Sequence, residues 1–235
     1  RRYLVLKLEK TANSSTCRRL LVEAAGLIEQ LDQVHVEEVV LRQGLCVDAL
    51  RELPRDLFDH GILYRYVNES GANFIGFYYS NIRDYLLACE VHQLGDRTRP
   101  NRVTRLAAMY RTYVGESAAI YYSRTGSAKD RKDCLEAAYE ADQANRTVQV
   151  ARLLAWDGGA IISELSGEDR EKLLQHLETL LFANDGSTTI ADQILDVVTR
   201  LDVDTGVEAM LVRWLCRFAE TGKGAFVMTC HRIAG

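Results

Sequence analysis

The chain has 235 residues, of which 47% are hydrophobic and 26% charged, and its net charge is −4. This length can bury the core of one large domain or two small ones, and with only two prolines long helices meet few interruptions. Because we find neither a run of about 18 apolar residues nor a signal-peptide pattern, we expect no membrane span and no export, but a mainly α, cytoplasmic protein with reduced cysteines.

The N-terminal region begins with two predicted helices. Apolar residues recur at helical spacing from Leu20 to Leu31, and Ser15 or Thr16 precedes them as a candidate N-cap. A second, shorter helix is predicted over residues 36 to 44, where three valines recur. Each helix should bury one face.

A third helix and a β-hairpin follow. The helix is predicted over residues 47 to 60, ending at a glycine suited to a left-handed terminus. Aromatic and β-branched residues then predict strands over 62 to 67 and 73 to 77, on either side of the turn-rich residues 68 to 71. Together these elements predict a winged-helix domain over residues 1 to 95, with the hairpin as its wing.

The helix that follows the hairpin, from Ser80 to Leu94, should bury two faces. Ser80 is its candidate N-cap. The apolar residues form two stripes, the first of Ile82, Tyr85, Leu86 and Cys89, and the second of Leu87, Val91 and Leu94. Because a small domain can cover only one of them, we expect this helix to join the winged-helix domain to another part of the protein.

Residues 96 to 235 are predicted to form an all-α region. The strongest apolar stripes fall within residues 166 to 181, which begin with a capping box, 187 to 201, and 207 to 218. The loops between them are short, which favours antiparallel neighbours and resembles a helical repeat array without a named repeat signature. We interpret this region as a sensor or repeat array.

Basic residues are concentrated in residues 96 to 132. This segment has nine lysines and arginines against three acidic residues, a net charge of +6, and four tyrosines lie among them. Such a segment can accept an acidic protein or a nucleic acid, and Arg102, Arg105 and Arg111 are the candidate partner-binding residues. The alternative is a solvated face beside the acidic helices that follow.

The sequence shows no catalytic constellation. A phosphate-binding loop needs spaced glycines and a Lys followed by Ser or Thr, and the nearest approach, Gly222 to Gly224, lacks the hydroxyl. The five histidines are far apart in sequence, which argues against a metal site. We therefore expect neither a catalytic residue, nor a metal, nor a cofactor within the chain itself.

One segment resembles a known family. Residues 57 to 88 read LFDHGILYRYVNESGANFIGFYYSNIRDYLLA. This resembles the winged-helix segment of STAND-class NTPases, including NACHT proteins. The corresponding segment of that family usually ends in a pattern similar to FxHxxxxEYLAA. Phe77 matches the Phe, Asp84 the acid, and residues 85 to 88 the YLAA tail, whereas Tyr79 occupies the position of the His.

The resemblance implies a signalling switch. In that family the winged helix follows an ATPase core and helps to hold ADP through the His, so Tyr79 is the candidate nucleotide-binding residue here. ATP or ADP with magnesium would bind the parent protein, with a missing ATPase core as partner and oligomerisation on activation. Bacterial members include antiphage defence ATPases, which suggests defence or stress signalling.

Two other functions stay open on the sequence alone. Winged helices often bind DNA, which would make the chain a transcription regulator. The predicted third helix, however, has four acidic residues against two arginines, the wrong balance for phosphates. A passive helical scaffold would fit the C-terminal residues but not the wing. The chain begins within an apolar and basic stretch, and we expect it to be part of a longer protein.

Overall fold

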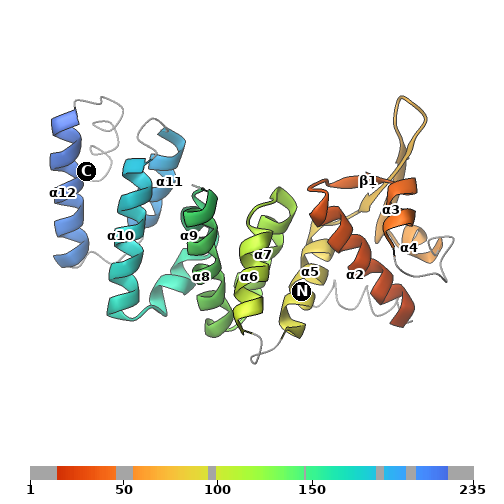
Figure 1. Cartoon of the computed structure of the whole chain (residues 1–235), viewed down its shortest axis with the longest axis horizontal. Coiled ribbons are helices and arrows are strands. Elements are labelled where there is room, and N and C mark those ends of the chain that lie inside the picture. The colour runs from red at the N-terminus through yellow and green to blue at the C-terminus, as the bar shows by residue number, and fades with distance from the viewer. Residues whose placement is uncertain are drawn as a thin grey trace. The chain divides into compact units, whose positions relative to one another are not determined.

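The protein is mainly helical, as predicted. The computed structural model describes residues 15–45, 55–94, 99–145, 147–183, 188–199 and 205–221. Over these residues it has eleven helices and one three-stranded antiparallel sheet (Figure 1). The chain divides into two compact units, residues 1–137 and 138–235, and the division falls within one helix, α8. No helix in the described ranges is both long and apolar enough to cross a membrane.

The predicted hairpin is confirmed. It comprises β2 (Leu63–Val67) and β3 (Asn73–Phe77), paired antiparallel with Tyr66 opposite Phe74. Asn68 closes the turn, because its Oδ1 accepts hydrogen bonds from the N–H groups of Ser70 (3.0 Å) and Ala72 (2.9 Å). Gly71 in the same turn has a φ of +83°, which a glycine adopts without a steric penalty.

The second helix is predicted wrongly at its start. Residues His35–Glu37 form a strand, β1, and the helix, α3, covers only Glu38–Gly44. β1 pairs with β3, so the sheet order is β1-β3-β2. The reason is tertiary: Val36 pairs with Ile75 and both are buried, and this edge of β3 is available only once the hairpin has formed.

The third predicted helix is described only at its end. There α4 covers Arg55–Asp59, and residues 46 to 54 lie outside the described residues. The predicted left-handed terminus is confirmed, since Gly61 has a φ of +61°.

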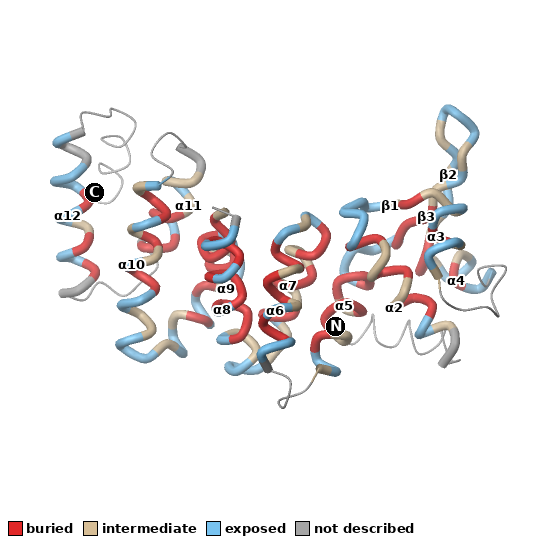
Figure 2. Tube along the Cα trace, viewed as in Figure 1, coloured by how far each residue is buried: buried red, intermediate tan, exposed pale blue. Residues whose placement is uncertain are grey.

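The two-faced helix is the centre of the first unit. It is α5 (Ser80–Gln93), and it packs against α7, α2, α6 and β3. Residues of both stripes, Leu86 and Leu87 among them, are fully buried, which confirms that the helix has two faces to cover (Figure 2). Its N-cap residue is Tyr79, with no side-chain capping bond, so the prediction of Ser80 as the cap is wrong.

The other helices of this unit are α2 (Ser15–Gln30), α6 (Arg99–Met109), α7 (Tyr113–Thr125) and the first part of α8 (Ala128–Asn145). Because α5 packs on α6 and α7, extensive packing crosses the boundary expected between residues 95 and 96, whereas the compact units divide between Ala137 and Ala138.

The second unit contains helices only among its described residues. They are the end of α8, α9 (Gln149–Ser163), α10 (Gly167–Ala183), α11 (Thr188–Thr199) and α12 (Thr205–Thr221). The capping box before α10 forms, because the Asp169 N–H donates to the Ser166 hydroxyl over 3.2 Å. The predicted apolar stripes are buried along α10 and in much of α11 and α12, while the Ser187 candidate cap lies outside the described residues.

Truncation of either stripe of α5 should destabilise the chain. Leu86→Ala and Leu87→Ala should each lower the free energy of unfolding by about 2 to 5 kcal/mol, because each leaves a cavity in a fully buried site. Val39→Ala, at a residue that is 54% exposed, should change it by less than about 0.5 kcal/mol. Urea unfolding followed by circular dichroism measures all three, and a small loss for Leu87→Ala would mean that the second face is not part of the cooperative core.

Candidate functional site

The outer side of the sheet carries aromatic rings. We call this surface the aromatic face, and it consists of His35, Tyr64, Tyr66 and Phe74. Residues that pair directly across antiparallel strands point to the same side of the sheet. Gly76 pairs with both His35 and Tyr64, and Phe74 pairs with Tyr66. All four rings are half-buried, whereas the opposite side of the sheet presents the buried core residues Leu63, Ile75 and Phe77.

The rings pack on one another. Tyr66 and Phe74 are stacked, with centroids 5.3 Å apart and planes at 17°. Tyr64 stacks on Tyr66 at 6.1 Å, and His35 meets Tyr66 edge-on at 5.1 Å. A Cβ at Gly76 would lie 2.9 Å from the ring of Tyr64, so this glycine allows the ring to lie close over the backbone. The aromatic face is therefore preorganised, because its rings pack on one another without a ligand.

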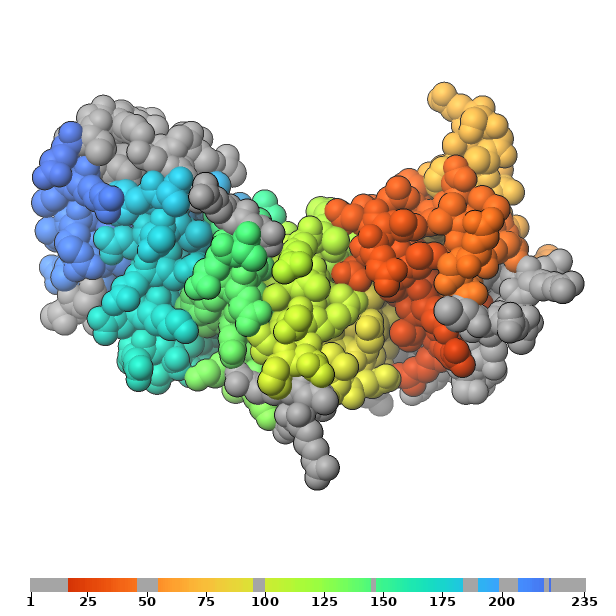
Figure 3. Space-filling view, in the orientation of Figure 1, coloured from red at the N-terminus to blue at the C-terminus, as the bar shows by residue number. Residues whose placement is uncertain are grey.

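Two further tyrosines extend this group to the start of α5. Tyr78 and Tyr79 are 60% and 43% exposed, and their rings meet at 4.9 Å. Tyr78 also meets Tyr64 edge-on at 6.5 Å. Tyr79, the predicted nucleotide-binding residue, thus belongs to a cluster of rings with Tyr78 and Tyr64. The β2–β3 hairpin, which carries Tyr64, projects from the first unit (Figure 3).

The three candidate partner-binding arginines do not share a surface. Arg102 is 3% exposed and is bound to the buried Asp133. Arg105 donates two hydrogen bonds to Glu29, of 3.1 and 2.9 Å. Only Arg111 of the three is exposed. The expectation that Arg102 faces a partner is therefore wrong in this structure, because its guanidinium forms an ion pair inside the first unit.

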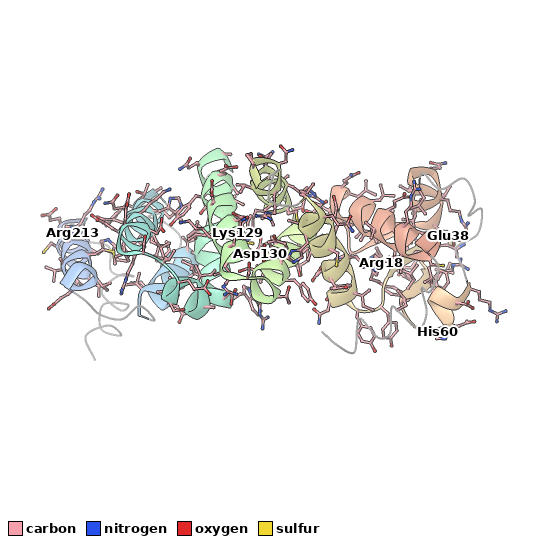
Figure 4. The ribbon with its side chains drawn as sticks, turned by 90° about the horizontal axis from the view of Figure 1, so that it is seen from below. Arg18, Glu38, His60, Lys129, Asp130 and Arg213 are labelled. Atoms are coloured by element: carbon pink, nitrogen blue, oxygen red, sulfur yellow. The ribbon has the colours of Figure 1, made fainter. Side chains whose placement is uncertain are left out.

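Hydrogen bonds to Asp130 stabilise the start of α8. Asp130 accepts a hydrogen bond of 2.6 Å from the Tyr122 hydroxyl and one of 2.7 Å from the Ser127 N–H. Figure 4 labels Asp130 and the neighbouring Lys129. Partial burial disfavours the charged carboxylate, but these hydrogen bonds outweigh it and hold the pKa of Asp130 below its ordinary value. The first-turn carboxylate also suits the helix dipole. This group therefore has a structural role.

A buried ionic group links α5 to α7. Arg83 and Asp84 are 4% and 2% exposed, and the Arg83 guanidinium donates to Oδ1 of Asp84 over 2.9 and 2.7 Å. Ser117 on α7 donates its hydroxyl to the other oxygen, Oδ2, over 2.7 Å. Burial raises the pKa of Asp84 above its ordinary value, although Arg83 and the Ser117 hydrogen bond act against that shift.

The second unit has its own buried carboxylate. Oδ1 of Asp142 accepts hydrogen bonds from the Gln149 N–H and the Thr147 hydroxyl, and Oδ2 accepts one from the Val150 N–H. The Nε2 atom of His176 lies 3.2 Å from Oδ2. Since the two N–H groups belong to the first turn of α9, this carboxylate satisfies donors that the helix itself cannot.

Comparison with known proteins adds no assignment. No protein-family model, curated protein or solved structure matches this chain. Among the described residues, no group of three or more His, Cys, Asp or Glu side chains is placed to hold a metal ion. The four described cysteines, Cys17, Cys89, Cys134 and Cys216, form no disulfide with one another.

Reversal of the buried and the exposed arginine should have different effects. Arg102→Glu places a carboxylate beside Asp133 in a buried site. It should lower the free energy of unfolding by at least about 3 to 5 kcal/mol, the cost of breaking a buried ion pair. Arg111→Glu should change the free energy of unfolding by less than about 0.5 kcal/mol. Urea titrations of the two variants measure this difference, and equal stabilities would contradict the buried position of Arg102.

Loss of the Ser117 hydroxyl should produce a pH-dependent destabilisation. The pKa of Asp84 is raised in the native state, so the folded protein keeps this proton to a higher pH than the unfolded chain does. The contribution of Asp84 to the free energy of unfolding therefore falls as the pH rises from about 4 through the raised pKa. Ser117→Ala raises that pKa further and should steepen the loss, costing about 1.5 to 3 kcal/mol when Asp84 is ionised and less near pH 4.

The matched control for this change is Ser163→Ala, since the Ser163 hydroxyl bonds only a carbonyl oxygen on an exposed helix surface. Urea unfolding at intervals between about pH 4 and 8 gives both curves. A cost for Ser117→Ala that does not vary with pH would show that its hydroxyl does not act on the ionised Asp84.

Proposed function

We propose that this chain is the regulatory winged-helix and helical sensor portion of a STAND-type, ATP-dependent signalling switch. The order of elements supports the winged helix. Helices α2, α3 and α4 precede the β2–β3 hairpin, which takes the place of the wing, and β1 adds a third strand to it. The described order of elements over residues 15 to 79 thus supports a winged-helix plan.

The observation that carries the proposal is the position of the resemblance residues. Phe77, Asp84 and residues 86 to 88 are all buried, at the point where the sheet meets α5 and α5 meets the following helices. Asp84 itself reaches α7 through Ser117. A regulatory module must transmit a change from one part of the protein to another, and a helix packed on both sides can do so as a rigid element.

Tyr79 has the accessibility that a nucleotide contact needs. It stands at the N-cap of α5 with 43% of its surface exposed, beside the residues that match the family line. A phenol can donate one hydrogen bond to a phosphate oxygen, in place of the imidazole of the family His. The remaining phosphate and magnesium ligands would come from the ATPase core of the parent protein.

The described charges give less support to DNA binding. In α4 the guanidinium of Arg55 lies 3.3 Å from the carboxylate of Asp59, so the described end of the candidate recognition helix offers no surplus positive charge. A defence or stress-signalling role rests on the resemblance alone. In this proposal the trigger is recognised by the second unit or, separately, by the exposed Arg111 of the first unit.

The chain by itself should not bind nucleotide tightly. Calorimetric titration with ATP and with ADP should give dissociation constants weaker than about 10 μM, because tighter binding, worth roughly −7 kcal/mol, needs a preformed phosphate site. The complete gene product that contains this chain should hydrolyse ATP with magnesium and bind ADP. A complete product that does neither would refute the proposal.

Tyr79→Phe in that complete product tests the assigned contact. Loss of a hydrogen bond to a charged phosphate should weaken ADP binding about tenfold, and Tyr78→Phe is the matched control, because it removes a hydroxyl from the neighbouring exposed ring. Equal affinities in the two variants would remove Tyr79 from the nucleotide site while leaving the ATPase assignment to the first experiment.

A further inference from the structure

The surroundings of the aromatic face carry surplus negative charge. Residues 35–45 and 55–79 contain five carboxylates against three guanidinium groups. Each of those guanidinium groups already has a carboxylate partner: Arg42 and Arg65 pair with Glu38, and Arg55 pairs with Asp59. Because Arg42 and Arg65 share Glu38, three carboxylates, those of Glu37, Asp56 and Glu69, are left without a guanidinium partner among the described residues.

One of these carboxylates lies on the same side of the sheet as the aromatic face. Glu37 pairs with Phe74 across the strands, so it lies on the same side of the sheet as the stacked rings of Tyr66 and Phe74. Glu37 is half-buried, and no ion pair joins it to any described residue. A carboxylate beside the electron-rich faces of aromatic rings favours a cation, and it disfavours an anion.

The same part of the molecule already shows this chemistry. The guanidinium of Arg65 lies 4.9 Å from the centroid of the Phe58 ring, while it also bonds Glu38 over 2.8 Å. An arginine here thus combines a ring face with a carboxylate. The aromatic face and the neighbouring Glu37 offer the same two components, and none of these five residues is an arginine.

We propose that the aromatic face is a binding surface for a peptide segment rich in arginine or lysine. Its cationic side chains would lie over the rings of Tyr64, Tyr66 and Phe74, and one would pair with Glu37. Tyr78 extends the surface toward α5. This inference does not depend on the proposed switch function, because it uses only the sheet, its rings and its charges.

Single-stranded nucleic acid is the other polymer that aromatic platforms bind. Bases stack on such rings, but nucleic-acid grooves combine them with positive charge that follows the phosphates. The charge here has the opposite sign, which favours the basic peptide.

The experiment is fluorescence anisotropy of the full 235-residue chain with a labelled nona-arginine peptide at about 50 mM salt, where charge pairs are weakly screened. Saturable binding is expected. Tyr66→Leu keeps apolar bulk but removes the ring face, and Glu37→Gln keeps the shape but removes the charge. Each should weaken binding about two- to fivefold, the range for one exposed cation–π contact or ion pair.

Two matched variants serve as controls. Tyr113→Leu removes a tyrosine that is 74% exposed on α7, and Glu140→Gln removes one exposed charge on α8. Neither should change the affinity for the peptide. If they weaken binding as much as Tyr66→Leu and Glu37→Gln do, the peptide is held by net charge alone and the proposal is wrong.

Two further results decide the matter independently of variant stability. In the wild-type chain, amide chemical-shift changes on adding the peptide should concentrate in β1, β2 and β3, and a spread over the helices instead would overturn the proposal. A labelled 20-nucleotide oligo-dT should bind more weakly than the peptide. Tighter binding of the oligonucleotide, or no saturable peptide binding, would also overturn it.

Discussion

Two-sided burial of α5 is the constraint on which the first unit depends. An amphipathic surface helix needs one apolar stripe, but Leu86 and Leu87 are neighbours in sequence and both are fully buried. Such a helix is stable only when other elements cover it on both sides, and here α2 and β3 share that role with α6 and α7. The sheet and the helices that follow it are consequently held by one common element.

Ionic contacts reinforce this arrangement at specific points. Burial of a charge is costly unless an opposite charge and hydrogen bonds accompany it. Asp84 meets this requirement through Arg83 and Ser117, and Arg105 meets it through Glu29 and Glu90. Since Glu29 belongs to α2, Glu90 to α5 and Arg105 to α6, a single side chain ties together three helices that the apolar contacts also join. The basic segment of residues 96 to 132 is thus partly neutralised inside the unit.

The aromatic face has the opposite character. Its rings are ordered by one another and by the space over Gly76, but they stay half-buried, and the half-buried Glu37 lies on the same side of the sheet. A surface of this kind contributes little to the core, whose residues lie on the other side of the sheet. Ordered, partly exposed aromatic surface is a common property of recognition sites, because rigid rings lose little conformational entropy on binding.

Residue spacing alone predicts the class of fold and most of the elements. Helical periodicity identified α2, α5 and the last three helices, strand composition identified the hairpin, and the two stripes of the Ser80 to Leu94 helix anticipated its burial on both faces. These are local properties that follow from residue spacing.

Three other features depend on tertiary contacts. Val36 forms a strand only because the free edge of β3 accepts it, a pairing between residues 39 positions apart. Arg102 is buried because Asp133 on another helix neutralises its charge. Counting charges along the chain does not predict that these two residues pair. The aromatic face exists because strand register gathers His35, Tyr64, Tyr66 and Phe74 on one side, and register depends on which strands pair, which no single segment encodes.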